Sequence, residues 1–154
     1  MNGDDFIKLL GLTSYDPEVK ALLAQCGIRK EPKIPRGDET DVIDVPKLGL
    51  EITFRDERYL DVKSAKYPDG ALVLSNVRMY GDWSPDFKPF TGTLPHGLTF
   101  EVKPPQASKK LGRKPAWEDD DKRHVRWDFP NHCVFLRFAS DGKLGEVAVQ
   151  LPLE

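Results

Sequence analysis

The sequence predicts an α+β fold, in which short helices pack on antiparallel sheet and two related helix–loop–three-strand halves follow each other. Near the N-terminus, apolar residues recur every three to four positions, as on an amphipathic helix. From about residue 48 onward they alternate with polar residues, as on a half-buried strand. Short turn sequences separate the alternating segments, which favours antiparallel hairpins. The chain has 154 residues, so residues 1–154 are expected to form a single domain.

Two helices are predicted before the first strand. Residues 4–12 carry one apolar stripe, and residues 15–27 carry a longer one. In the second helix Asp16 is placed to cap the N-terminus, and Pro17 fits the first helical position. Gly27 is placed to end it in a left-handed conformation. The apolar stripe of the second helix consists of Val19, Leu22, Leu23 and Cys26.

A polar, proline-containing loop and a meander of strands should follow. Residues 29–40 are predicted as the loop. Residues 48–54, 59–67 and 71–81 are predicted as strands, since each shows apolar alternation or a long apolar run and short turn sequences join them. Such strands form an antiparallel meander.

The second half begins with a loop that is rich in proline and aromatic residues. Residues 82–97 are predicted as an ordered surface loop or crossover, and residues 98–102 as a short strand. Residues 104–112 are predicted as a helix that starts near a proline and ends at Gly112. Three further strands are predicted over residues 124–129, 133–140 and 146–152.

The two halves align as a pseudo-repeat over about residues 16–80 and 98–152, which changes the predicted fold. In this alignment residues 41–46, 48–54 and 59–67 match residues 124–130, 133–139 and 146–152 as the three strands of each half. The aligned pairs are Gly27 with Gly112, Pro46 with Pro130, and Phe54 with Phe138.

Composition and charge argue against several classes of protein. Apolar residues make up 39% of the chain, which is too many for wholesale disorder. The chain has 23 Lys and Arg against 25 Asp and Glu, a net charge of −2, which argues against nucleic acid as a partner. The first residues are acidic, unlike a secretory signal, and no apolar run is long enough for a membrane span. We therefore expect a cytoplasmic protein with no membrane partner.

The two cysteines, Cys26 and Cys133, both lie in apolar-periodic segments. In a reducing compartment, separate buried thiols are favoured over a disulfide.

An acidic run, "EDDD", interrupts the second half. Glu118, Asp119, Asp120 and Asp121 stand in a row. Clustered carboxylates can hold a metal, act in acid–base chemistry or form a docking surface for a basic partner. They can equally form a solvated loop. The run lacks the spaced oxygen ligands and the glycine of a calcium loop, so no metal is predicted. A docking surface and a solvated loop both stay open.

A second candidate surface surrounds Trp83. Tyr80, Asp82, Trp83 and Asp86 lie in or beside the proline-rich loop. Aromatic residues of this kind either pack on the sheet or dominate a protein interface. Trp127 alternates with apolar neighbours, so it is expected in the core instead.

No arrangement of residues predicts catalysis. His96, His124 and His132 show no metal-ligand spacing, and a nucleophile elbow or phosphate-binding loop is missing. Cys133 follows His132 directly, so on a strand the two side chains point to opposite faces. We therefore predict no enzyme activity, no catalytic residue, no metal and no cofactor.

The segments "LGLTSYDPEVKALLAQCG" and "GTLPHGLTF", and "KLGRKP" before the final strands, resemble cognate immunity proteins of bacterial polymorphic-toxin and type VI secretion systems. The resemblance implies a cytoplasmic protein that binds and neutralises a cognate secreted toxin, for example a nuclease, by occluding its active site. In that case the acidic run is the first candidate contact, since it would complement a basic cleft. Two alternatives stay open: a non-catalytic scaffold or accessory protein of a secretion or phage system, and a small hydrolase. The oligomeric state also stays open.

Overall fold

A computed structural model describes residues 1–60, 67–68 and 70–153. Within these residues the fold is α+β, with three α-helices and one seven-stranded antiparallel sheet in the order β1-β2-β3-β7-β6-β5-β4. The helices are α1 (Gly3–Leu9), α2 (Pro17–Gln25) and α3 (Pro104–Leu111). The strands are β1 (Thr40–Val45), β2 (Leu50–Asp56), β3 (Leu72–Tyr80), β4 (Trp117–Glu118), β5 (His124–Phe129), β6 (His132–Phe138) and β7 (Leu144–Gln150). Short 3-10 turns are η1 (Pro46–Leu48), η2 (Glu57–Tyr59) and η3 (Pro95–Gly97).

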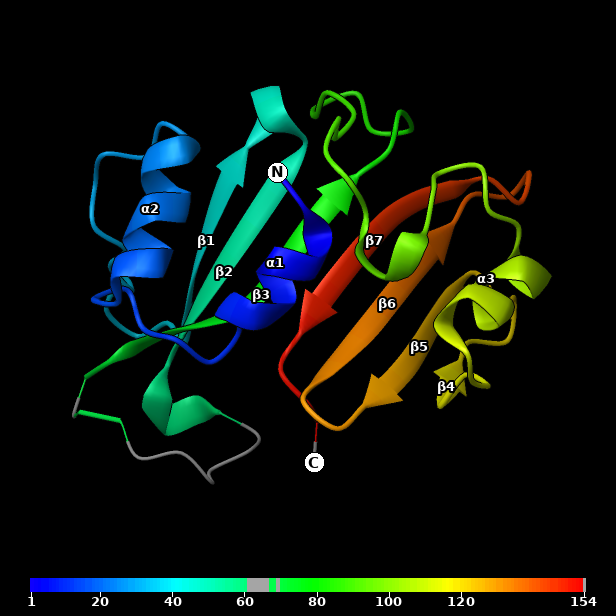
Figure 1. Ribbon diagram of the computed structural model, residues 1–154. Helices are drawn as coiled ribbons and strands as arrows, with labels where there is room; N and C mark the ends of the chain where they lie inside the picture. Colours follow the sequence, from blue (N-terminus) through cyan, green and yellow to red (C-terminus); the bar gives the residue numbers. More distant parts are fainter. Residues whose placement is uncertain (61–66, 69, 154) are drawn as a thin grey trace.

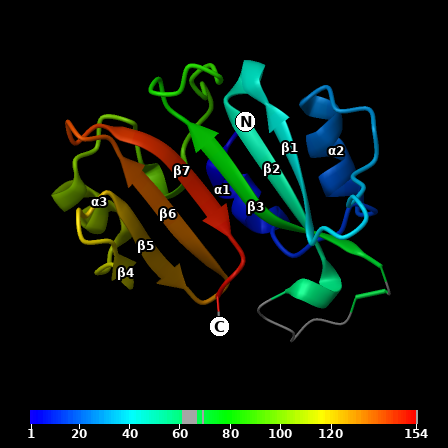
Figure 2. The same ribbon diagram turned by 180° about the vertical axis from the view of Figure 1, so that it is seen from behind.

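The hydrophobic core lies between the α-helices and one face of the sheet. In Figure 1 α1 and α3 lie in front of the strands, and in Figure 2 the strands lie in front of these helices. Phe6 of α1, Val19 of α2 and Ala107 of α3 are buried in the same cluster as the inward side chains of the strands. Among the largest fully buried strand residues are Leu50, Ile52, Phe54, Trp127, Leu136 and Val134. The helices are short, so burial of these apolar faces rather than helix propensity stabilises them.

The local helix signals are largely confirmed. Gly27 and Gly112 follow α2 and α3 with φ of +75° and +71°. Pro17 is the first residue of α2, but the side chain of Asp16 does not cap this helix. Its carboxylate instead accepts hydrogen bonds from the Thr13 amide, at 2.7 Å, and the Thr13 hydroxyl, at 3.2 Å. Asp16 therefore fixes the turn before the helix.

One predicted strand needs correction, and a second lies mostly outside the described residues. Residues 98–102 form a turn, in which the Val102 amide donates to the Thr99 carbonyl, and not a strand. For the strand predicted over residues 59–67, Tyr59 belongs to η2, Leu60 is buried after it, and residues 61–66 lie outside the described residues. The strand that pairs with β2 is β3.

The structure gives no support for two related halves. Among the described residues the third strand of the first half is β3, and residues 61–66 of the segment aligned with residues 146–152 lie outside them. The second half also contains the additional strand β4, which pairs with β5. The predicted crossover over residues 82–97 is confirmed, and its Phe90 and Leu94 are buried in the core.

Candidate functional site

The face of the sheet opposite the α-helices is the candidate functional site. Along β2, Leu50, Ile52 and Phe54 point into the core, so Glu51 and Thr53 point to the other side. The same alternation continues on the neighbouring strands. We call the side chains of three adjacent rows on this side the open face. The first row contains Tyr80, Glu146, Arg137 and His124. The second row contains Asp44, Glu51, Arg78, Ala148, Phe135, Arg126 and Trp117. The third row contains Val42, Thr53, Asn76, Gln150, Cys133 and Asp128.

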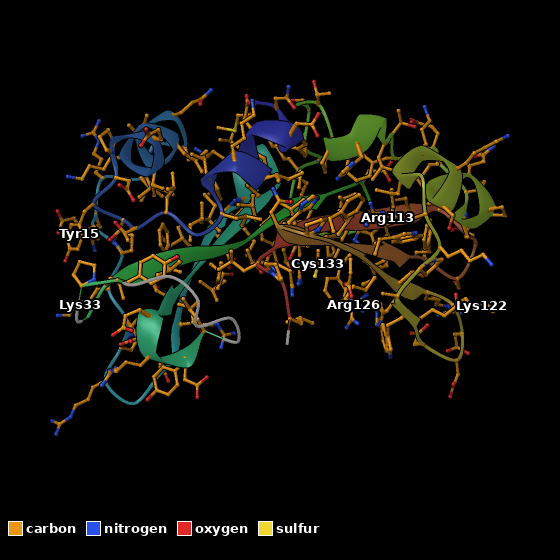
Figure 3. All side chains as sticks on the ribbon, turned by 60° about the horizontal axis from the view of Figure 1, so that its bottom comes forward. Tyr15, Lys33, Arg113, Lys122, Arg126 and Cys133 are labelled. Atoms are coloured by element: carbon orange, nitrogen blue, oxygen red, sulfur yellow. The ribbon has the colours of Figure 1, made fainter. Side chains whose placement is uncertain are left out.

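Arginine and tryptophan mark the part of the open face near β4. Trp117 is 45% exposed, although it is one of the largest apolar side chains. Arg126 lies beside it in the register and forms an ion pair with Asp128 at 2.9 Å. Figure 3 shows Arg126 on the side of the sheet away from the helices. Arg and Trp are enriched among the residues that dominate protein interfaces, so this surface has the composition of a binding site.

A hollow of about 360 Å³ lies in the middle of the open face. Its base includes Ala148, whose small side chain stands between Arg78 and Phe135 in the second row. The rim includes Trp117 and His124. A methyl group flanked by longer side chains therefore creates the depression.

Glu146 is a nearly buried carboxylate in this hollow, with 8% of the residue exposed. Its oxygens lie 3.5 Å from Arg78 Nη1 and 3.5 Å from Arg137 Nη1. These contacts are ion pairs, but both are longer than a good hydrogen bond. Among the described residues, no side-chain hydrogen bond reaches this carboxylate.

His124 on the rim is oriented by Asp119. Asp119 Oδ2 lies 3.3 Å from His124 Nδ1, and Asp119 Oδ1 accepts hydrogen bonds from the amides of Arg123 and His124. Desolvation alone would raise the pKa of Asp119, but the hydrogen bonds from these amides and the nearby His124 outweigh it and lower the pKa. Asp119 is thus a structural residue of the turn between β4 and β5.

The other members of the acidic run stay exposed. Glu118 ends β4, and Asp120 and Asp121 lie in the turn that follows. Lys122 adopts a left-handed φ of +57°, and its amide donates to the Asp119 carbonyl. The run therefore begins in a short strand and continues in a turn, and Asp119 is the member whose carboxylate accepts hydrogen bonds from the turn amides. Contact of the exposed three with a partner stays a prediction.

The aromatic candidate surface consists mainly of packed side chains. Tyr80 is 8% exposed, stacks on Phe87 at 4.0 Å and donates its hydroxyl to Glu51 at 3.0 Å. Burial and this hydrogen bond raise the pKa of Tyr80 to about 12. Trp83 lies against Gly145, and its ring is 5.1 Å from the Arg137 guanidinium. Of the two reasons for aromatic residues here, packing on the sheet is the one observed.

The acids of that loop are more exposed. Asp82 forms an ion pair with Lys143, at 2.6 Å, and Asp86 is exposed. Tyr80 and His124 are separated by β7 and β6 in the register. The structure therefore does not unite the loop and the acidic run.

A histidine pair lies on the helix side of the sheet. His96 Nε2 and His132 Nε2 are 2.9 Å apart, and Asn131 Oδ1 lies 2.6 Å from His132 Nδ1. The Phe129 ring stacks on both imidazoles. Desolvation lowers the pKa of His96, and desolvation together with the neighbouring His96 and Arg113 lowers that of His132 to about 4. The spacing in the sequence gives no signal for this contact, because the fold makes it.

Cys133 lies on the opposite face from its neighbour, as predicted. Its thiol donates to Asp128 Oδ1 at 3.2 Å, whereas His132 contacts His96. Cys26 and Cys133 are both free, and Cys133 is the more buried. Trp127 is in the core, also as predicted.

Neither a metal-binding group nor a membrane helix is found in the described part of the chain. No three or more His, Cys, Asp or Glu side chains there are arranged to hold a metal ion. None of the helices there is long and apolar enough to span a membrane.

Comparison with protein-family models, with curated proteins and with solved structures finds no match for this chain.

The sequence alone does not predict the arginines and Glu146 of the open face as parts of a binding site. Arg78, Arg126, Arg137 and Glu146 alternate with buried residues along their strands, which marks them as outward-facing. That signal is visible in the sequence. The order of the strands, which brings these residues together, is not.

Proposed function

We propose that this protein is a cytoplasmic immunity protein that binds and neutralises a cognate secreted toxin without any turnover of its own. The resemblance to immunity proteins of polymorphic-toxin and type VI secretion systems motivates the proposal. The observation that carries it is the open face, because its exposed Trp117 and its arginines have the composition of a protein interface.

The sheet suits the task of an inhibitor. Each strand of the open face is hydrogen-bonded to its neighbours, and the other face packs on the core. The backbone under the interface is therefore ordered before a partner binds, which limits the entropy lost on binding. Occlusion of the toxin's active site needs only this surface.

Co-expression tests the proposal. Cells that express the toxin from the gene next to this one should survive when they also express this protein. Survival should be lost with Trp117→Ala and kept with Tyr15→Ala, since Tyr15 is 63% exposed but lies far from Arg126 (Figure 3). Death of the cells despite the wild-type protein, or absence of a neighbouring toxin, would contradict the proposal.

A scaffold or accessory protein of a secretion or phage system is the first alternative. The same open face supports it, since it differs only in the partner. Co-purification with a structural component of such a system, with no protection against a toxin, would favour this alternative.

A small hydrolase is the second alternative, and the hollow provides a specific observation for it. His124 lines the hollow together with Glu146, and outside the lining it contacts Asp119, so this histidine has one carboxylate beside it and shares the hollow with another. The described residues that line the hollow include no Ser, Thr or Cys, so water would be the nucleophile. Hydrolysis of an ester or phosphodiester that disappears in His124→Ala would favour the enzyme.

The relation between the two halves is also a proposal. A helix, a loop and three strands follow in each half, which supports it. Superposition of α2 with β1–β3 on α3 with β5–β7 in an experimental structure would test it.

A further inference from the structure

We propose that the hollow around Ala148 receives an acidic side chain of the protein partner, held between the guanidinium groups of Arg78 and Arg137. The inference rests on the proposed function and adds the chemistry of the contact: the toxin inserts an Asp or Glu carboxylate here.

The two arginines flank the hollow with unused donors. Their side chains are 35% and 49% exposed. Each contacts Glu146 at 3.5 Å, and within the described residues neither guanidinium donates a hydrogen bond. Arg78 Nε in particular is buried without a partner. A carboxylate placed between them would accept charge-assisted hydrogen bonds that Glu146 does not make at this distance.

The charge of the hollow favours an anion. Arg78 and Arg137 together carry two positive charges, and Glu146 is the single carboxylate among the described residues that line the hollow. The hollow is thus locally cationic, in contrast to the chain as a whole, with its net charge of −2.

The surroundings hold the arginines in place and limit contact with water. Trp83 lies under the Arg137 guanidinium, at 5.1 Å, and Glu146 draws both arginines toward the hollow. Phe135 is half-buried next to Ala148, and Trp117 stands at the edge. A partner that covers this apolar surround would desolvate the ion pairs and strengthen them.

The same features favour a protein carboxylate over a nucleic-acid backbone. Glu146 lies within the hollow and would repel the successive phosphates of a strand. A single acidic side chain needs only one site and avoids this repulsion. The contact is also distinct from the acidic run, which suits a basic partner surface.

Binding of the purified neighbouring toxin to charge-removing variants tests the inference. Arg78→Gln and Arg137→Gln should each weaken affinity by about tenfold or more, because a desolvated ion pair is lost. Arg55→Gln is the matched control: its side chain is also 35% exposed and lies 3.5 Å from a glutamate, but outside this hollow. Arg55→Gln should change affinity by less than about twofold.

The outcomes separate the two proposals. If the wild-type protein binds the toxin and both hollow variants bind equally well, the inference is wrong and the proposed function stands. If the wild-type protein does not bind, the proposed function fails. Melting curves would show whether Arg78→Gln still folds. If it does not, Arg137→Gln still tests the inference, because Arg137 is half-exposed and its replacement should not prevent folding.

A probe without toxin gives an independent result. N-acetyl-glutamate, titrated into isotopically labelled protein, should shift the guanidinium resonances of Arg78 and Arg137 and leave those of Arg55 in place. Absence of these shifts would overturn the inference. So would a single-stranded RNA oligonucleotide that moves the same resonances at lower concentration, since that result favours nucleic acid.

Discussion

Burial of His132, together with its contact with His96, lowers the pKa of His132 and makes the stability of the protein depend on pH. His132 is 5% exposed, and its pKa is lowered to about 4 in the folded state, against an ordinary value of 6.5. Because the unfolded chain takes up the proton more readily, protonation favours unfolding. The contribution of neutral His132 to the free energy of unfolding is fully present above about pH 6.5 and is lost as the pH falls toward 4.

Urea unfolding at about pH 7.5 and about pH 4.5 should therefore give a lower free energy of unfolding in acid, by roughly 2–3 kcal/mol for this group. The loss should shrink in His132→Phe, which keeps an aromatic ring beside Phe129 but cannot titrate. His124→Gln, on the open face, should keep it. An equal acid loss in His132→Phe would contradict this account.

The cysteines give a second prediction for single residues. Burial raises the pKa of Cys26 and of Cys133 to about 11, so neither is a thiolate at neutral pH. Cys133 is 1% exposed and should resist alkylation by iodoacetamide in the folded protein and react in urea. Replacement of either residue by Ala should cost about 1–2 kcal/mol and leave binding intact, since Cys133, although in the third row of the open face, is too buried to contact a partner. A disulfide in non-reducing mass spectrometry would refute the prediction.

At the scale of elements, the loop after β3 is held to the sheet by Trp83. A Cβ atom added at Gly145 would lie 2.3 Å from the Trp83 ring, so Gly145 must remain without a side chain while Trp83 packs there. Gly145→Ala should therefore destabilise the protein by about 2 kcal/mol through overpacking. In a Trp83→Ala background the same change should cost much less, which a double-mutant cycle measures. Additive costs would show that Trp83 does not lie on Gly145.

In the turn between β4 and β5, Asp119 has a structural role, whereas the exposed acids beside it are available to a partner. Asp119→Asn should lower the melting temperature by several degrees, because it weakens the acceptor for the Arg123 and His124 amides. Asp120→Asn should leave it unchanged, since Asp120 is exposed. If the run also contacts the toxin, reversal of Glu118, Asp120 and Asp121 to Lys should reduce the association rate. Equal melting temperatures for the two Asn variants would contradict a structural role of Asp119.

Elements with local signals could be predicted from the sequence. Pro17 and Gly27 bound α2, and the alternation of residues 124–129 predicts β5 with the same bounds. Residues 98–102 alternate in the same way, but Leu98 and Val102 are buried as parts of a crossover segment and not as a strand. Alternation reports burial on one side, and tertiary packing decides whether a partner strand is present.

At the scale of the whole molecule, the sheet order creates the candidate site. β3 pairs with β7, and β7 pairs with β6, so Arg78, Glu146 and Arg137 meet from three strands. The β3–β7 pairing joins residues far apart in the chain, which no local pattern reveals, whereas β6 and β7 form a hairpin. The sequence alone therefore predicts the acidic run and the loop around Trp83 as candidate binding surfaces, and not the open face. The three α-helices pack on the core side of the sheet and leave the other side for binding (Figure 2).

Calorimetry with the toxin encoded beside this protein would show whether the open face binds it, when Trp117→Ala and Tyr15→Ala are compared with the wild-type protein. Both variants remove an exposed aromatic ring, but only Trp117 lies on the open face. The account predicts a loss of about tenfold or more for Trp117→Ala and no change for Tyr15→Ala. Equal affinity of both variants and the wild-type protein would contradict a role of this part of the open face in binding the toxin.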